Sequence, residues 1–157
     1  MRLIVFAVLA AVLLATSPPA RAESFPPITN KAVLTECGEC HMAFFAEMLP
    51  RRSWLNILSN LDDHFGEDAS IDPESLSKII RHHITNASDV INSRGARKWR
   101  EGLKKQDAPK SITSAPRFVR KHDDSDFDKM WLRLKVRSKA DCAACHKDAV
   151  QGLFDDD

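Results

Sequence analysis

One five-residue unit, Cys-x-x-Cys-His, occurs twice in this chain and uses all four of its cysteines. The first copy spans residues 37–41 and the second residues 142–146. This unit is typical of covalent haem attachment, in which two thiols bind one haem and the histidine ligates its iron. We therefore predict two haem c groups. The attaching cysteines would be Cys37, Cys40, Cys142 and Cys145, and the iron ligands that follow them His41 and His146.

Other uses of the cysteines explain this pattern less well. A disulfide inside Cys-x-x-Cys closes a very small loop, which constrains the unfolded chain little. A zinc site made from the two pairs has suitable ligand spacing, but it leaves the histidine after each second cysteine unexplained. An exported zinc-binding domain is therefore the rival interpretation.

The N-terminus predicts export. A short positive start precedes an almost purely apolar run from Leu3 to Ala15, and Ala20-Arg21-Ala22 has the form of a cleavage site. The apolar run is too short to span a bilayer permanently. We expect residues 1–22 to be a signal peptide cleaved after Ala22, with no permanent membrane anchor, and a periplasmic mature protein.

The hydrophobic periodicity is mostly helical, which predicts an all-α fold with long connections. Ser53 is predicted to cap a helix that ends at Gly66, and Asp72 with Pro73 to begin a second whose apolar stripe runs to Ile91. Further helical segments are expected at residues 97–105, 116–122 and 125–135.

Each iron needs a second axial ligand, and the sequence offers several. The histidines outside the two units are His64, His82, His83 and His122, and the methionines after residue 22 are Met42, Met48 and Met130. Periodicity places His64 and His122 at the edges of apolar faces and His82 on a surface. His83 lies at the centre of an apolar stripe, where a packed core histidine is the commoner role.

The charges are sorted along the chain. Residues 94–121 contain ten Lys or Arg and two acids, whereas residues 61–74 contain six acids and no Lys or Arg. Solvated helix faces explain such runs in most proteins, but opposite patches also orient docking partners. Nucleic acid binding is not expected, because the basic run has little aromatic interleaving.

The residues also resemble a known family, the periplasmic dihaem cytochromes c. The most specific stretch is 63–70 (DHFGEDAS), which follows the first unit, Leu49-Pro50 and Ser53-Trp54. In the second half, Ile112-Thr113, Phe118, His122 and the unit at 142–146 are similar to the same family. The resemblance extends over most of the chain after residue 22.

The resemblance implies two unlike haem domains. Residues 23–95 would form a class I cytochrome c-like domain in which His41 and His64 ligate one iron. Residues 96–157 would form a small, mostly helical and irregular domain in which His122 and His146 ligate the other. His83 falls where the family tends to have an aromatic residue, which favours packing for His83.

The implied function is electron transfer through two bis-histidine, low-potential haems, without enzyme activity. By family analogy the acceptor is an oxygen-binding periplasmic cytochrome, and the donor is a membrane b-type cytochrome or the quinol pool. Two alternatives remain: the small dihaem subunit of a periplasmic reductase such as a nitrate reductase, and a haem enzyme acting on peroxide, nitrite or oxygen.

Overall fold

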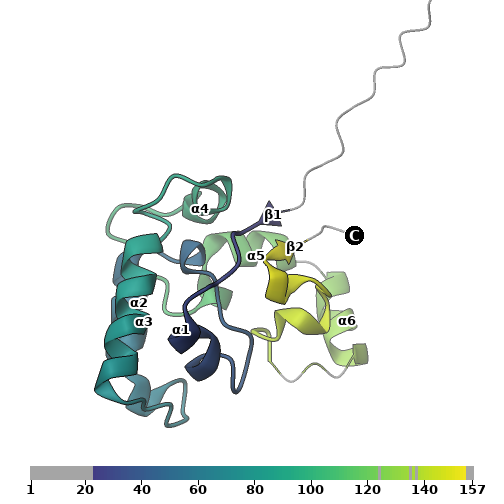
Figure 1. Cartoon of the computed structure of the whole chain (residues 1–157). Coiled ribbons are helices and arrows are strands. Elements are labelled where there is room, and N and C mark those ends of the chain that lie inside the picture. The colour runs from purple at the N-terminus through teal and green to yellow at the C-terminus, as the bar shows by residue number, and fades with distance from the viewer. Residues whose placement is uncertain (1–22, 124, 135, 137, 155–157) are drawn as a thin grey trace, which may run out of the picture.

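The computed structural model describes residues 23–123, 125–134, 136 and 138–154, and the predicted signal peptide lies outside them. Helices and short 3-10 turns dominate the described residues, so the all-α prediction is confirmed (Figure 1). The helices are α1 (Lys31–Glu36), α2 (Arg51–Leu58), α3 (Pro73–Asn86), α4 (Arg94–Arg100), α5 (Pro116–His122) and α6 (Ser125–Leu134). The 3-10 turns are η1 (Ala46–Met48), η2 (Leu61–Asp63), η3 (Ile112–Ser114), η4 (Cys142–Ala144) and η5 (Ala149–Gln151). Two short strands, β1 (Glu23–Ser24) and β2 (Leu153–Phe154), pair antiparallel.

Helix α3 begins as predicted. The Asp72 carboxylate accepts hydrogen bonds from the backbone N–H groups of Glu74 and Ser75, and Pro73 occupies the first turn. The helix ends at Asn86, before the predicted stripe does. After Asn86 the chain bonds to the segment before α2 instead, where the Ser88 N–H donates to the Leu49 carbonyl at 3.0 Å. The chain therefore leaves the helix axis, and Val90 is exposed.

The prediction for α2 is wrong at both ends. The helix begins at Arg51, and Ser53 lies buried inside it, with no hydrogen-bond partner for its hydroxyl among the described residues. It ends at Leu58 because Ser59 and Asn60 bond locally: the Ser59 hydroxyl donates to Asn56, and the Asn60 amide to the Asp63 carbonyl. His64 therefore follows the 3-10 turn η2 and does not lie on a helix.

The second half matches the prediction closely in two of three helices. Helix α5 has the predicted bounds, and α6 spans Ser125–Leu134, while the last position predicted for it, 135, lies outside the described residues. Helix α4 begins three residues early, because the Ser93 hydroxyl accepts from Ala96 N–H and caps it there. Beyond its end at Arg100, Gly102 takes a left-handed conformation (φ 87°) that turns the chain back.

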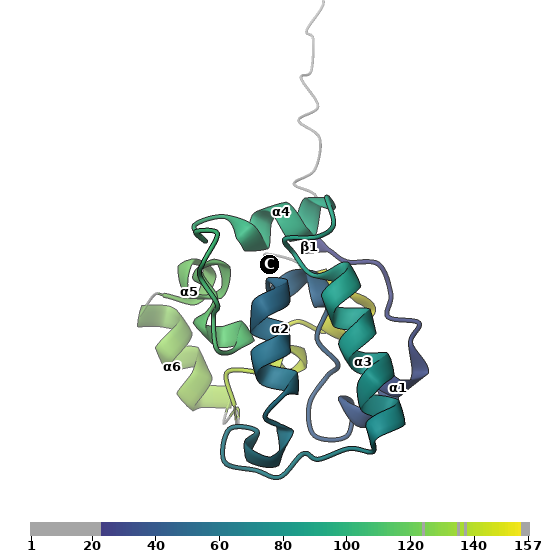
Figure 2. The ribbon, with the colours of Figure 1, turned by 90° about the vertical axis from the view of Figure 1, so that its left-hand side faces the viewer.

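One hydrophobic core joins both halves of the chain. Helices α2 and α3 pack side by side with α1 against α3, and α4 closes one end of the molecule (Figures 1 and 2). The buried cluster continues from Phe45 and Met48 to Trp99, Ile112 and Phe118. The predicted domain boundary between residues 95 and 96 falls within α4 and stays a prediction. The β1–β2 pair fastens the start of the described chain to its end.

Candidate haem sites

The first Cys-x-x-Cys-His unit lies opposite His64. The His41 and His64 rings have centroids 6.2 Å apart and planes inclined by 30°. His41 Nδ1 lies 2.8 Å from the Met42 carbonyl oxygen, which only accepts, so Nδ1 carries the proton and Nε2 keeps a free lone pair. Burial, and then the charge of His41, lower the pKa of His64, which favours the neutral imidazole that binds metals.

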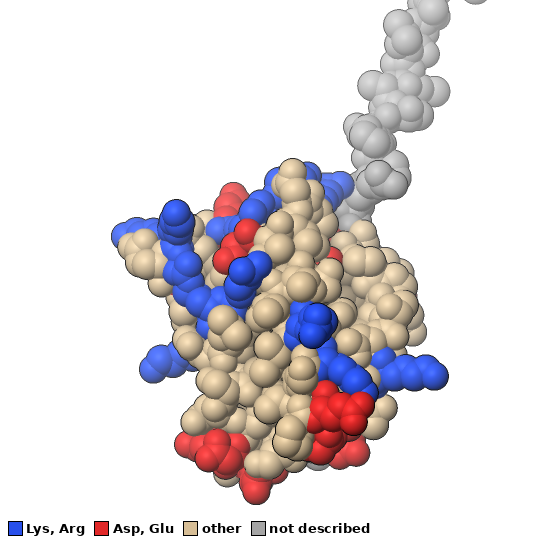
Figure 3. Space-filling view, turned by 60° about the vertical axis from the view of Figure 1, so that its left-hand side comes forward, with Lys and Arg blue, Asp and Glu red and all other residues tan. Residues whose placement is uncertain are grey.

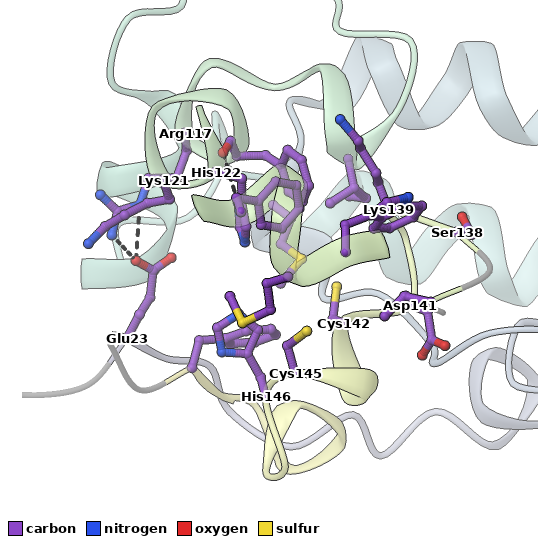
Figure 4. Close-up of a pocket in the computed structure, with 18 of the residues that line it drawn as sticks. Glu23, Arg117, Lys121, His122, Ser138, Lys139, Asp141, Cys142, Cys145 and His146 are labelled. Atoms are coloured by element: carbon purple, nitrogen blue, oxygen red, sulfur yellow. Dashed lines mark hydrogen bonds and ion pairs between the residues drawn. The ribbon is translucent and has the colours of Figure 1, made fainter. Parts of the chain in front are cut away.

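The second unit faces His122 across a cavity of about 540 Å³ (Figure 4). His122 projects from the last turn of α5 toward the segment that carries Cys142, Cys145 and His146. The His122 and His146 ring centroids are also 6.2 Å apart, but their planes are inclined by 87°. The cavity volume is within the usual range for cofactor sites, and its walls are mostly apolar.

Both histidine pairs have the spacing that an iron bound on two sides requires. Metal–imidazole bonds of about 2.0 Å place two opposed ring centres roughly 6 Å apart. The same 6.2 Å separation at two sites with different backbones fits one ligated iron at each. The residues present therefore fit the cofactor that the sequence predicts.

Within each unit the first cysteine is half-buried and the second is exposed. Burial is the main cause that raises the pKa of the Cys37 and Cys142 thiols to about 11. Redox-active Cys-x-x-Cys pairs instead have a depressed thiol pKa, near 7 or below. The environment of both pairs is therefore unlike that of a disulfide oxidoreductase.

His83 is a core residue. Its side chain is 2% exposed, its ring lies 4.2 Å from that of Trp54, and Nδ1 lies 2.9 Å from the Ile79 carbonyl oxygen. Burial lowers its pKa to about 4. The expectation that His82 is a surface residue holds only in part, because His82 is half-buried and packs edge-on against His83.

Two methionines remain near the second site. Met48 and Met130 both line its cavity, the first from η1 and the second from α6. His122 nevertheless stands directly opposite His146 at the spacing given above. A methionine ligand for the second iron would therefore have to displace His122, which already lies opposite His146.

A half-buried ion cluster beside the second cavity was not predicted from the sequence. The Glu23 carboxylate accepts from Trp99 Nε1 and pairs with Arg117 at 2.5 Å and Lys98 at 3.5 Å. Glu23 and Arg117 are separated by 94 residues in sequence. Only the acid–base complementarity of the two residues could have suggested this pair. Together they fix β1, α4 and α5 around one wall of the cavity (Figure 4).

The first site lies in an acidic region, whereas acidic and basic side chains both line the cavity of the second. Four exposed acids flank His64: Asp62, Asp63, Glu67 and Asp68. In Figure 3 acidic side chains gather at the lower end of one face, and basic side chains predominate over its upper part, with some acidic ones among them. The sorting of charge along the sequence is therefore kept in space only in part, because Lys110 of the basic run lies beside Asp63 and His64.

Among the described residues, no three His, Cys, Asp or Glu side chains gather as a zinc site requires. The described residues therefore give no support to the zinc interpretation. No helix within the described ranges is long and apolar enough to cross a membrane.

A mostly helical chain with two Cys-x-x-Cys-His units, each opposite a second histidine, defines a multihaem c-type cytochrome. The sequence profile of the dihaem cytochrome c family matches residues 33–154. The chain belongs to this dihaem cytochrome c family and carries two covalently bound haem c groups. Among curated proteins, none matches the chain.

Solved structures agree with this assignment. The chain is 42% identical to the dihaem cytochrome c from Rhodobacter sphaeroides, with a TM-score of 0.74, over 83% of this chain and 100% of that one. It is 34% identical to a dihaem c-type cytochrome from Shewanella baltica OS155, with a TM-score of 0.63, over 80% of this chain and 87% of that one. Dihaem cytochromes c are generally electron carriers, and the site geometry is consistent with electron transfer.

Proposed function

We propose that this protein relays single electrons in the periplasm through two bis-histidine, low-potential haems. The observation that carries the proposal is the pairing of His41 with His64 and of His122 with His146 at one common spacing. Cys37 and Cys40 attach the first haem, and Cys142 and Cys145 attach the second.

Two histidines on each iron leave no axial position for oxygen, peroxide or nitrite. A haem bound in this way supplies a redox-active iron and nothing that binds a substrate. Histidine in place of methionine as the second ligand lowers the reduction potential. The chain's own contribution is to hold the four rings: the carbonyls of Met42 and Phe118 accept from Nδ1 of His41 and His122 and so direct Nε2 inward.

Aromatic contacts connect the surroundings of the two sites. The His146 ring lies 5.5 Å from that of Phe154, which lies 6.3 Å from Phe45 in the common core. The neighbouring Phe44 stacks on His41 at 4.9 Å. Both ligand pairs are thus seated on one packed body, which supports electron transfer between them within the molecule.

Partners are proposed from family analogy and charge. The acceptor is an oxygen-binding periplasmic cytochrome, and the donor is a membrane b-type cytochrome or the quinol pool. Export with cleavage after Ala22 places the protein in the periplasm with them. The acidic side chains at one end of the molecule and the mainly basic ones above them favour weak, oriented docking of the kind that redox partners use (Figure 3).

Stopped-flow mixing of the reduced dihaem protein with the ferric acceptor tests this proposal. We expect two electrons per molecule to be transferred, at a rate that falls about tenfold or more from low to moderate salt. Matched charge reversals, Asp62→Lys/Glu67→Lys and Lys104→Glu/Lys105→Glu, should slow the reaction unequally, because only one region faces the acceptor. No electron transfer to any periplasmic cytochrome would contradict the proposal.

A further inference from the structure

The two histidine pairs share a spacing but differ in the angle between their rings. The planes of His41 and His64 are inclined by 30°, which is closer to parallel, whereas those of His122 and His146 are inclined by 87°, which is nearly perpendicular. Attachment motif and ligand type are the same at both sites. The difference in angle therefore arises from the residues that hold the rings.

Phe118 holds His122 in two ways. Its carbonyl oxygen lies 2.9 Å from His122 Nδ1, one helical turn away on α5, and its ring lies almost parallel to the imidazole at 4.1 Å and 20°. Phe127 of α6 also contacts the imidazole, in an edge-type arrangement with the ring centroids 4.8 Å apart and the planes inclined by 67°. Phe118 is itself buried in the common core, so the plane of the His122 ring is fixed by the packing of α5.

Comparable contacts at the first site are looser. Phe44 stacks on His41 at 4.9 Å and 29°. His64 is accompanied by Phe65, which is 65% exposed. In the described part of the chain each of these two rings contacts one phenylalanine, whereas His122 contacts two.

The angle between two axial imidazoles sets the electronic structure of a low-spin ferric iron. Each ring donates from a filled π orbital perpendicular to its plane and raises whichever iron d orbital that orbital overlaps. Two parallel rings raise the same d orbital and split the pair of d orbitals strongly. Two crossed rings raise one each and leave the pair nearly equal in energy. Orientation of a ligand by its surroundings is thus a lever on the metal separate from ligand identity.

We propose that Phe118 is the positioning residue that crosses the rings of His122 and His146, and that the two haems consequently have different ligand fields. This inference rests on the bis-histidine ligation proposed above. Electron paramagnetic resonance of the oxidised, fully haem-loaded protein should show two low-spin signals of different shape. The first haem gives three resolved g values, and the second gives a single large-g feature with broad, weak partners.

Phe118→Met tests the role of the ring itself. Methionine fills a similar space and leaves the residue 118 carbonyl in place, but it offers no flat surface to the imidazole. We expect the large-g feature to shift or disappear while the signal of the first haem stays unchanged. Phe118→Tyr should restore the feature. Phe44→Met is the matched control and should leave the large-g feature intact.

The outcomes separate this inference from the proposed function. Two alike rhombic low-spin signals in the unaltered protein overturn the crossed-ring inference and leave bis-histidine ligation standing. A high-spin signal in the unaltered protein overturns the ligation itself. An unchanged large-g feature in Phe118→Met shows that another contact sets the angle. If that variant does not retain both haems, Phe118→Leu, which also removes the flat ring, takes its place, and an unchanged large-g feature there rejects the role of Phe118.

Discussion

The two candidate haem sites have the same spacing between their histidine rings but unlike surroundings. At the first, His64 lies on a turn after η2 among exposed acids, beside the exposed ring of Phe65. At the second, His122 ends a packed helix and faces a cavity of about 540 Å³. The comparison teaches that the spacing of the ligand pair is the shared requirement, whereas the scaffold around each pair is free to differ.

The sites also differ in how the common core depends on them. Val33, Leu49 and Ile79 are fully buried in the first half, where protein side chains pack against one another. Around the second site, Met48, Trp99 and Phe118 belong both to the core and to the cavity wall. The second haem should therefore stabilise the contact between the halves, and the first should do so less.

Removing one haem at a time should test this difference between the sites with the largest expected effect. In Cys142→Ala/Cys145→Ala the apolar wall that the second haem would cover becomes exposed to water, and Met48, Trp99 and Phe118 of the common core lose a packing partner. We expect this variant to lose cooperative thermal unfolding, measured by circular dichroism. Cys37→Ala/Cys40→Ala, confirmed by haem staining to hold one haem, should unfold cooperatively at a lowered temperature. Equal losses in both would show that the sites support the core alike.

Acid should destabilise the first half through His83. The unfolded chain binds a proton near the ordinary histidine pKa of 6.5, but burial delays protonation in the folded chain until about pH 4. Above pH 6.5 His83 is neutral in both states and does not reduce the free energy of unfolding. As the pH drops from 6.5 to 4, the free energy of unfolding falls by roughly 3 kcal/mol. Urea unfolding across this range should show a flatter pH profile for His83→Phe. His82→Gln is the control. Burial also lowers the pKa of His82, but less of that residue is buried, so its effect should be smaller.

Two glycines with left-handed backbone provide a smaller, matched test. A methyl group at Gly152 (φ 84°) would lie 2.6 Å from the Phe25 carbonyl oxygen, whereas at Gly66 (φ 95°) it would meet nothing within 4 Å. Gly66→Ala should cost only conformational strain, about 1 kcal/mol, and Gly152→Ala about 2–4 kcal/mol through the added clash. Melting temperatures of both variants check the order. A larger loss for Gly66→Ala would mean that the turn after His64 is the more constrained site.

Local signals explain which helices were predictable. Asp72-Pro73 and Pro116 mark helix starts through their own backbone and side-chain chemistry, so α3 and α5 begin where the sequence indicates. The end of α2 was missed because Ser59 and Asn60 bond to neighbouring backbone groups and interrupt an otherwise apolar stripe.

The site residues were predictable only where they belong to a recognisable motif or to a stretch that resembles the family. The two units, and the resemblance around His64 and His122, named the histidines that the structure brings together in pairs, and their role as ligands stays a prediction. The bond between Glu23 and Arg117 depends on a contact across 94 residues, and the ring angles depend on packing by Phe118 and Phe44. Neither follows from periodicity or from a motif.

The central claim is that each iron is closed by its own histidine pair. Optical and magnetic spectra of His64→Ala, His122→Ala and His83→Ala, with carbon monoxide added to the reduced proteins, test it most directly. We predict one high-spin haem and one bound carbon monoxide per molecule in each of the first two variants. The unaltered protein and His83→Ala should show neither. A high-spin haem in His83→Ala together with none in His64→Ala would contradict the account.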